Sequence, residues 1–163
     1  MSEDNKFDVV IYGSTGFTGR LVVEYMMSQY GHDGDVSWAM AGRSLDKLAL
    51  VRDEAGAGPA TPLIVANSDD SDSLNKMVNQ AKCVLTTVGP YQLYGSNLVS
   101  SCAKLGTDYV DLTGEPGWMH EMIEQHEETA KASGSRIVFS CGFDSIPFDL
   151  GVLFTQNAAK EKY

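Results

Sequence analysis

The sequence of 163 residues predicts an α/β fold in which one parallel β-sheet carries helices on both faces. Two observations predict it: strand-like and helix-like segments alternate along the chain, and a glycine-rich loop follows the first strand-like segment. A chain of this length can form one domain with a sizeable core. Its composition, 43% hydrophobic and 21% charged residues, is typical of a soluble globular protein.

The expected elements follow from apolar runs and their spacing. Strands are expected at 7–12, 36–41, 63–66, 83–88, 109–112 and 136–139. Helices are expected at 21–30, 45–55, 71–81, 96–105 and from Pro116 to near Gly134; the third has Leu74, Met77, Val78 and Ala81 on one face. Glycines follow four of these five helices, as expected where the chain needs a left-handed residue to turn back. Six strands and five helices predict the doubly wound order 3-2-1-4-5-6 of a Rossmann fold.

The loop after the first strand has the spacing Gly13-x-x-Gly16-x-x-Gly19. The first glycine permits a tight turn, the second lets the backbone approach a pyrophosphate, and the third lets the following helix pack on the sheet. Between them, Ser14, Thr15, Phe17 and Thr18 would turn backbone N–H groups toward the phosphates, together with the helix N-terminus. A merely structural turn is the alternative, but the strand and helix on either side favour a dinucleotide site.

The end of the second strand favours NADP over NAD. An acidic residue there would accept a hydrogen bond from the ribose 2′-hydroxyl, but this chain has Arg43 and Ser44. The guanidinium is a planar, permanently charged group suited to a 2′-phosphate, and the serine adds a hydroxyl. The alternatives are a solvent-exposed arginine and a serine that only caps the second helix; we expect Ser44 to bind and to cap.

Two further loops complete the expected cofactor site. Asn67 closes the third strand, where it could bind the adenine amine or serve only in a turn. The fourth strand leads into Val88, Gly89, Pro90 and Tyr91, at the crevice where the strand order reverses. These four residues are expected beside the nicotinamide ribose, with a simple Gly-Pro turn as the alternative.

Charge and cysteine content exclude several classes of protein. The formal net charge of −10 disfavours nucleic acid as a partner. The chain has three cysteines, with no Cys-x-x-Cys pair among them: Cys83, Cys102 and Cys141. They are expected to be buried free thiols of a protein in a reducing compartment. Cys141 could instead be reactive, because an unusual loop follows it. A polar, acidic N-terminus predicts a cytoplasmic protein. No metal site is expected, since His120 and Glu124 are typical of a solvated helix face.

The catalytic residues stay unknown. The chain lacks a Tyr-x-x-x-Lys pair, a Gly-x-Ser-x-Gly nucleophile elbow and a phosphate-binding P-loop. Asp111, Glu115 and Asp144 follow the fifth and sixth strands, at the edge where ligands bind in open α/β sheets. They could act in proton transfer or orient a substrate, and they could equally cap helices or brace loops.

Five segments together resemble the saccharopine dehydrogenase-like oxidoreductases, near the branch of the trans-acting enoyl reductases. They are YGSTGFTGR (12–20), AGRS (41–44), VGPYQLYG (88–95), YVDLTGEP (109–116) and GFDSIP (142–147). The resemblance implies NADP binding by residues 13–19 and Arg43, and a nicotinamide-side role for Gly89, Pro90 and Tyr91. The family often has aspartate where this chain has Asn67, which weakens the adenine assignment.

The resemblance also implies how the chain is divided. Residues 1–147 are expected to form the cofactor domain, and 148–163, with a helix over 148–160, to begin a link to a second, substrate-binding domain absent from this chain. The predicted function is the NADP(H)-binding domain of an oxidoreductase that transfers hydride to or from a small-molecule substrate of enoyl or imine type. The domain alone is expected to be inactive, and the full-length protein could be a homodimer. The alternative is a non-catalytic NADP-sensing or interaction module.

Overall fold

A six-stranded sheet forms the centre of the protein in the computed structural model, which describes residues 7–31 and 34–162. Its strands are β1 (Phe7–Tyr12), β2 (Trp38–Gly42), β3 (Leu63–Val65), β4 (Ala81–Thr86), β5 (Asp108–Val110) and β6 (Ile137–Val138). They lie in the order β3-β2-β1-β4-β5-β6, and every neighbouring pair is parallel. The predicted doubly wound Rossmann fold and its strand order are confirmed.

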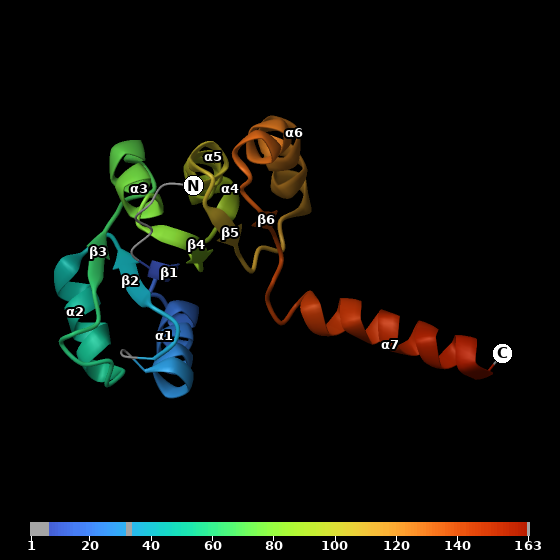
Figure 1. Ribbon diagram of the computed structural model, residues 1–163, viewed down its shortest axis with the longest axis horizontal. Coiled ribbons are helices and arrows are strands. Elements are labelled where there is room, and N and C mark those ends of the chain that lie inside the picture. The colour runs from blue at the N-terminus through green and yellow to red at the C-terminus, as the bar shows by residue number, and fades with distance from the viewer. Residues whose placement is uncertain (1–6, 32–33, 163) are drawn as a thin grey trace.

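The helices lie on both faces of this sheet. They are α1 (Phe17–Tyr30), α2 (Leu45–Glu54), α3 (Ser71–Val78), α4 (Tyr91–Tyr94), α5 (Ser96–Leu105), α6 (Pro116–Ser133) and α7 (Ile146–Lys162). Figure 1 shows α1 and α2 on one face and α3, α5 and α6 on the other. The change of face after β3 follows from right-handed crossovers, because the chain reverses its direction across the sheet at that point.

Side chains of the strands point alternately into two hydrophobic cores. Val10 of β1 packs in the core that contains Leu98 of α5 and Met122 of α6. Its neighbour Ile11 packs in the other core, with Val23 of α1. Because β1 is buried on both faces, its sequence reads as a continuous apolar run rather than an alternating one.

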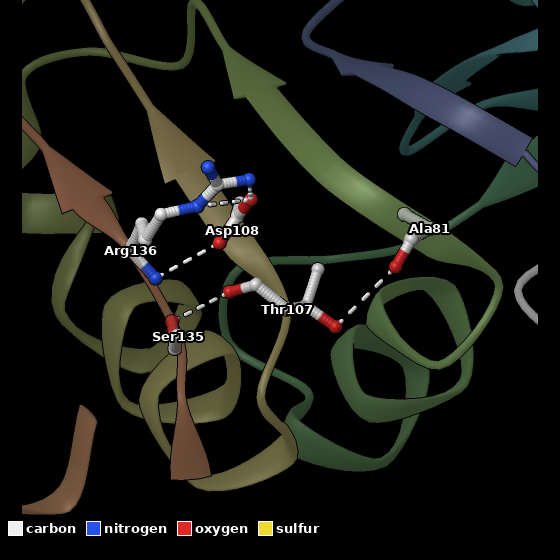
Figure 2. Close-up of polar contacts among 5 residues, drawn as sticks. All are labelled: Ala81, Thr107, Asp108, Ser135 and Arg136. Carbon is white, nitrogen blue, oxygen red and sulfur yellow. Dashed lines mark hydrogen bonds and ion pairs between the residues drawn. The ribbon is translucent and has the colours of Figure 1, made fainter. Parts of the chain in front are cut away.

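Polar contacts hold the amino ends of β4, β5 and β6 together (Figure 2). The Thr107 hydroxyl donates to the carbonyl of Ala81 at 3.4 Å, and the Ser135 hydroxyl donates to the carbonyl of Thr107 at 2.6 Å. The Arg136 guanidinium binds the Asp108 carboxylate. These contacts lie at the edge of the sheet opposite the carboxyl ends of the strands. The edge where ligands bind in such folds is therefore formed by the loops that follow the strands.

Most predicted boundaries differ from the structure by one to three residues, and two differences change how an element is understood. Helix α1 begins at Phe17 rather than at Leu21, with Gly16 as its extended N-cap residue, so the glycine loop runs straight into the helix. Ala81 is the first residue of β4, paired with Phe7, and not the end of a helix. An alanine beside buried neighbours fits the buried face of either element, and helical spacing alone could not distinguish them.

The helix expected at 148–160 is present as α7, which extends away from the sheet (Figure 1). None of its described residues is buried, and it exposes large apolar side chains such as Phe148 and Phe154. Within residues 7–31 and 34–162, no helix is long and apolar enough to cross a membrane.

Candidate functional site

The glycine loop turns sharply where β1 ends, and Gly13 makes the turn possible. Its φ of +95° lies in the left-handed region that L side chains rarely adopt. A Cβ atom at this position would also lie 2.7 Å from Thr87 Oγ1 and 2.8 Å from Val88 Cγ2. The loops after β1 and β4 therefore approach each other at the crevice to a distance that only glycine permits.

Gly19 brings the first turn of α1 against the same loop. A Cβ atom on Gly19 would lie 2.1 Å from the Gly13 carbonyl oxygen and 2.9 Å from the Ser14 Cα. Between them, the Gly16 amide donates to the Gly13 carbonyl at 2.9 Å, which closes the turn. Loop and helix thus form one compact unit with the helix N-terminus facing the cleft.

Ser14 holds the loop to the sheet. Its buried hydroxyl donates to the Ile11 carbonyl at 2.6 Å and accepts from the Ala41 amide at 3.3 Å. Its own amide donates to the Ala41 carbonyl at 3.2 Å. Ser14 was expected to offer its amide to the phosphates, whereas the structure uses both of its polar groups to join the loop to β2.

The neighbouring amides are free for a phosphate. Among the described residues, no acceptor is found for the backbone N–H groups of Thr15, Phe17 and Thr18. They belong to the loop and the first turn of α1, whose partial positive charge attracts anions. The Phe17 side chain is exposed, so its contribution would come from the backbone.

A cleft of about 220 Å³ opens beside this loop. Six of the predicted residues line it: Gly13, Thr15, Gly16, Arg43, Val88 and Gly89. Five lining residues were missed by sequence reasoning: Tyr12, Gly42, Ser68, Thr87 and Tyr94. Most of these directly adjoin a predicted residue, so extending each motif by one position would have found them; Tyr94 lies in a helix that was not predicted.

Arg43 lines the cleft from the end of β2. It is exposed, and no described carboxylate forms an ion pair with it, so its charge is available to a ligand. Ser44 does not line the cleft. Its hydroxyl accepts from the Lys47 amide at 3.4 Å, which confirms the predicted cap of α2.

Asn67 forms the predicted turn after β3. Its side-chain oxygen accepts from the Asp69 amide at 3.4 Å, and its amide donates to the Ser73 hydroxyl at 3.0 Å. The next residue, Ser68, is buried and lines the cleft. Nearby, burial raises the pKa of the Tyr12 hydroxyl, which therefore stays protonated and can donate.

The loop after β4 places some of its predicted residues in the cleft and others in the core. Val88 and Gly89 line the cleft, and Pro90 is the N-cap residue of α4. Tyr91 does not line it: its hydroxyl donates to the Thr86 carbonyl at 3.2 Å, and burial raises its pKa to about 12. Tyr94, one helical turn later, lines the cleft instead.

The acidic candidates have structural partners or lie at the surface. The buried Asp111 carboxylate accepts from the Tyr109 hydroxyl at 2.8 Å and from the amides of Thr113 and Ser140 at 3.1 and 2.8 Å. Burial raises its pKa despite these bonds. Glu115 binds backbone amides of α4, and Asp144 is exposed.

The cysteines agree with expectation in part. All three are free, and Cys102 is buried, but Cys83 is half-buried and Cys141 is exposed. The expected burial of Cys141 is therefore wrong, because this residue lies in the loop after β6, the edge strand of the sheet. In the part of the chain that the structure describes, no cluster of three His, Cys, Asp or Glu residues could hold a metal ion.

With this geometry in place, comparison with known proteins identifies the family. The model of the saccharopine dehydrogenase NADP binding domain matches residues 9–138, which include the glycine loop, Arg43 and the loop after β4. The chain belongs to this family. The match begins within β1 and ends with the last residue of β6, so it includes every residue that lines the cleft.

Relatives of this chain carry different names. A trans-acting enoyl reductase of Mycobacterium leprae is 46% identical over 154 residues, 93% of this chain and 36% of the relative. A lipid droplet localized protein of Caenorhabditis elegans is 43% identical over 162 residues, 94% of this chain and 37% of the relative. The chain thus spans little more than a third of these relatives.

Among solved structures, saccharopine dehydrogenase of Saccharomyces cerevisiae superposes with a TM-score of 0.68 at 20% identity. The superposition covers 85% of this chain and 28% of that enzyme. At this identity the match shows a shared fold, which agrees with the doubly wound sheet described above.

Proposed function

We propose that this chain is the NADP(H)-binding domain of an oxidoreductase that transfers hydride to or from a small-molecule substrate. The observation that carries the proposal is the cleft, in which the glycine loop and Arg43 meet without a carboxylate at the end of β2. Membership of an NADP-binding family supports the same cofactor.

The residues present fit this cofactor. Gly13 and Gly19 let the loops after β1 and β4 and the start of α1 pack closely, where a Cβ atom would collide with neighbouring protein atoms. The amides of Thr15, Phe17 and Thr18 would bind the pyrophosphate. Arg43 would bind the 2′-phosphate, and the loop from Val88 would flank the nicotinamide. The bound nicotinamide supplies or accepts the hydride, and the protein orients it and shields it from water.

The substrate class we propose is an enoyl or imine compound, because a relative is named an enoyl reductase and the family name refers to saccharopine dehydrogenase. Since the chain spans about 36% of that relative, we propose that a further domain covers the cofactor and supplies substrate contacts. The domain alone would then bind NADPH and turn over little or no substrate.

A non-catalytic NADP-sensing module is the second candidate, and one observation favours it. The carboxylates of Asp111 and Glu115 are engaged in structural hydrogen bonds and neither residue lines the cleft, so neither of these two candidates is placed to donate a proton there. NADPH oxidation by the full-length protein, assayed across enoyl and imine substrates, distinguishes the two: turnover supports the oxidoreductase, and binding without turnover supports the sensor.

Titration of this chain with NADPH and NADH tests the cofactor assignment. A hydrogen bond to a charged group contributes about 1.5–3 kcal/mol, so we expect NADPH to bind at least tenfold more tightly than NADH. Arg43→Ala should remove most of this preference, while Lys47→Ala, which removes one exposed charge from α2, should not. Equal affinity of the unmodified chain for both cofactors would refute the role of Arg43.

A further inference from the structure

Glu115 links two loops that lie far apart in the sequence. It is the N-cap residue of α6, and its two carboxylate oxygens accept from two successive amides at the start of α4. Oε1 lies 2.8 Å from the Tyr91 nitrogen and Oε2 lies 2.9 Å from the Gln92 nitrogen. Pro90, the preceding residue, has no N–H group, so Glu115 satisfies the first two amides that this segment offers.

The segment that Glu115 holds forms one wall of the cleft. Val88 and Gly89 line the cleft just before the two bound amides, and Tyr94 lines it just after them. Tyr94 is the last residue of α4, a four-residue helix that begins at Tyr91. A helix this short has too few internal hydrogen bonds to set its own position, so tertiary contacts must do so.

The start of α6 fixes the far end of the same segment. The Trp118 ring packs against the Tyr91 ring at a centroid distance of 5.6 Å, and its Nε1 donates to the Ser96 hydroxyl at 3.0 Å. A Cβ on Gly95 would lie 2.5 Å from the Trp118 ring. Trp118 and the Tyr91 ring thus provide apolar packing, whereas Glu115 provides a charged anchor beside the lining residues.

We infer that Glu115 is a positioning residue for the nicotinamide end of the cleft, acting through its bonds to the Tyr91 and Gln92 amides. The inference rests on the proposed NADP(H) function. In this role Glu115 does not touch the cofactor; it sets where Val88, Gly89 and Tyr94 stand. The 2′-phosphate end of the cleft is built by β2 and Arg43, so it should not depend on Glu115.

The test compares two ligands on the same variants. NADPH would occupy both ends of the cleft, whereas adenosine 2′,5′-bisphosphate lacks the nicotinamide and its ribose and would report only on Arg43 and the glycine loop. Glu115→Gln keeps the size of the side chain but replaces one accepting oxygen by an amide that cannot accept, and it removes the charge. Glu121→Gln is the matched control, because Glu121 is exposed on α6 and its side chain has no described hydrogen-bond partner.

We expect Glu115→Gln to weaken NADPH binding about tenfold and to leave binding of the bisphosphate within about twofold, with Glu121→Gln changing neither. Equal weakening of both ligands would reduce Glu115 to general structural support and overturn the inference, as would unchanged NADPH binding. If Glu115→Gln does not fold, Glu115→Asp keeps the charge but is too short to reach both amides; it should show the same selective loss, smaller in size. Failure of the unmodified chain to bind either ligand would instead overturn the proposed function itself.

Discussion

Gly19→Ala tests the packing of the glycine loop against α1. The added methyl carbon would lie 2.1 Å from the Gly13 carbonyl oxygen, 2.8 Å from the Gly13 carbonyl carbon and 2.9 Å from the Ser14 Cα. All three are backbone atoms, which cannot rotate away as a flexible side chain could. The helix must therefore move away from the loop, or the loop must open.

Two opposing terms set the size of the effect. Alanine is better than glycine within a helix by about 1 kcal/mol. Overpacking a buried site costs roughly 1–3 kcal/mol, and contact with rigid backbone places this site at the upper end of that range. The free energy of unfolding should therefore fall by about 2 kcal/mol, which corresponds to a Tm lower by roughly 4–8 °C for a domain of this size.

Gly117→Ala is the matched control for this prediction. Gly117 also lies in the first turn of a helix, α6, but a Cβ there would meet no atom within 4 Å. The control should be as stable as the unmodified chain, or more stable by up to about 1 kcal/mol. Thermal or urea unfolding measures both variants, and equal stability of the Gly19 and Gly117 variants would refute the account of the loop.

Two further predictions concern polar contacts of β1 and of the glycine loop that follows it. The Lys82 ammonium and the Ser37 hydroxyl and amide lower the pKa of Asp8 to about 2, so the carboxylate's contribution to stability is complete above about pH 4 and is lost as the pH falls toward 2. Asp8→Asn should therefore be less stable than the unmodified chain near neutral pH, and this difference in stability should disappear in acid. A difference that does not change with pH would contradict this. Ser14→Ala removes the hydroxyl's hydrogen bonds to Ile11 and Ala41, so it should lower the free energy of unfolding by about 1 kcal/mol and weaken NADPH binding. Unchanged NADPH binding, measured by calorimetry, would show that the glycine loop holds its shape without these two hydrogen bonds.

The sheet and half of the cleft could be predicted because their signals are local. A glycine loop between an apolar strand and a helix places the phosphate site, and alternation of strands and helices dictates the strand order. Arg43 was predicted to face the same site because it follows β2, the neighbour of β1 in that order. Each of these inferences needs only residues that are close together in the sequence.

What could not be predicted depends on contacts between distant residues. Helix α4 has four residues and is held by Glu115, which lies 24 positions after Tyr91, so no local pattern indicated it. Tyr94 was missed for the same reason, and Tyr91 was placed in the cleft although its ring packs against Trp118. A carboxylate at a strand end can be catalytic or structural, and only the bonded amides show which role Glu115 has.

A crystal structure of this chain with NADP⁺ tests the central claim most directly. The account predicts the 2′-phosphate against the Arg43 guanidinium and the pyrophosphate on the amides of Thr15, Phe17 and Thr18. The nicotinamide should then lie beside Val88 and the loop that follows it. A 2′-phosphate directed into solvent, or a cofactor bound outside this cleft, would contradict the account.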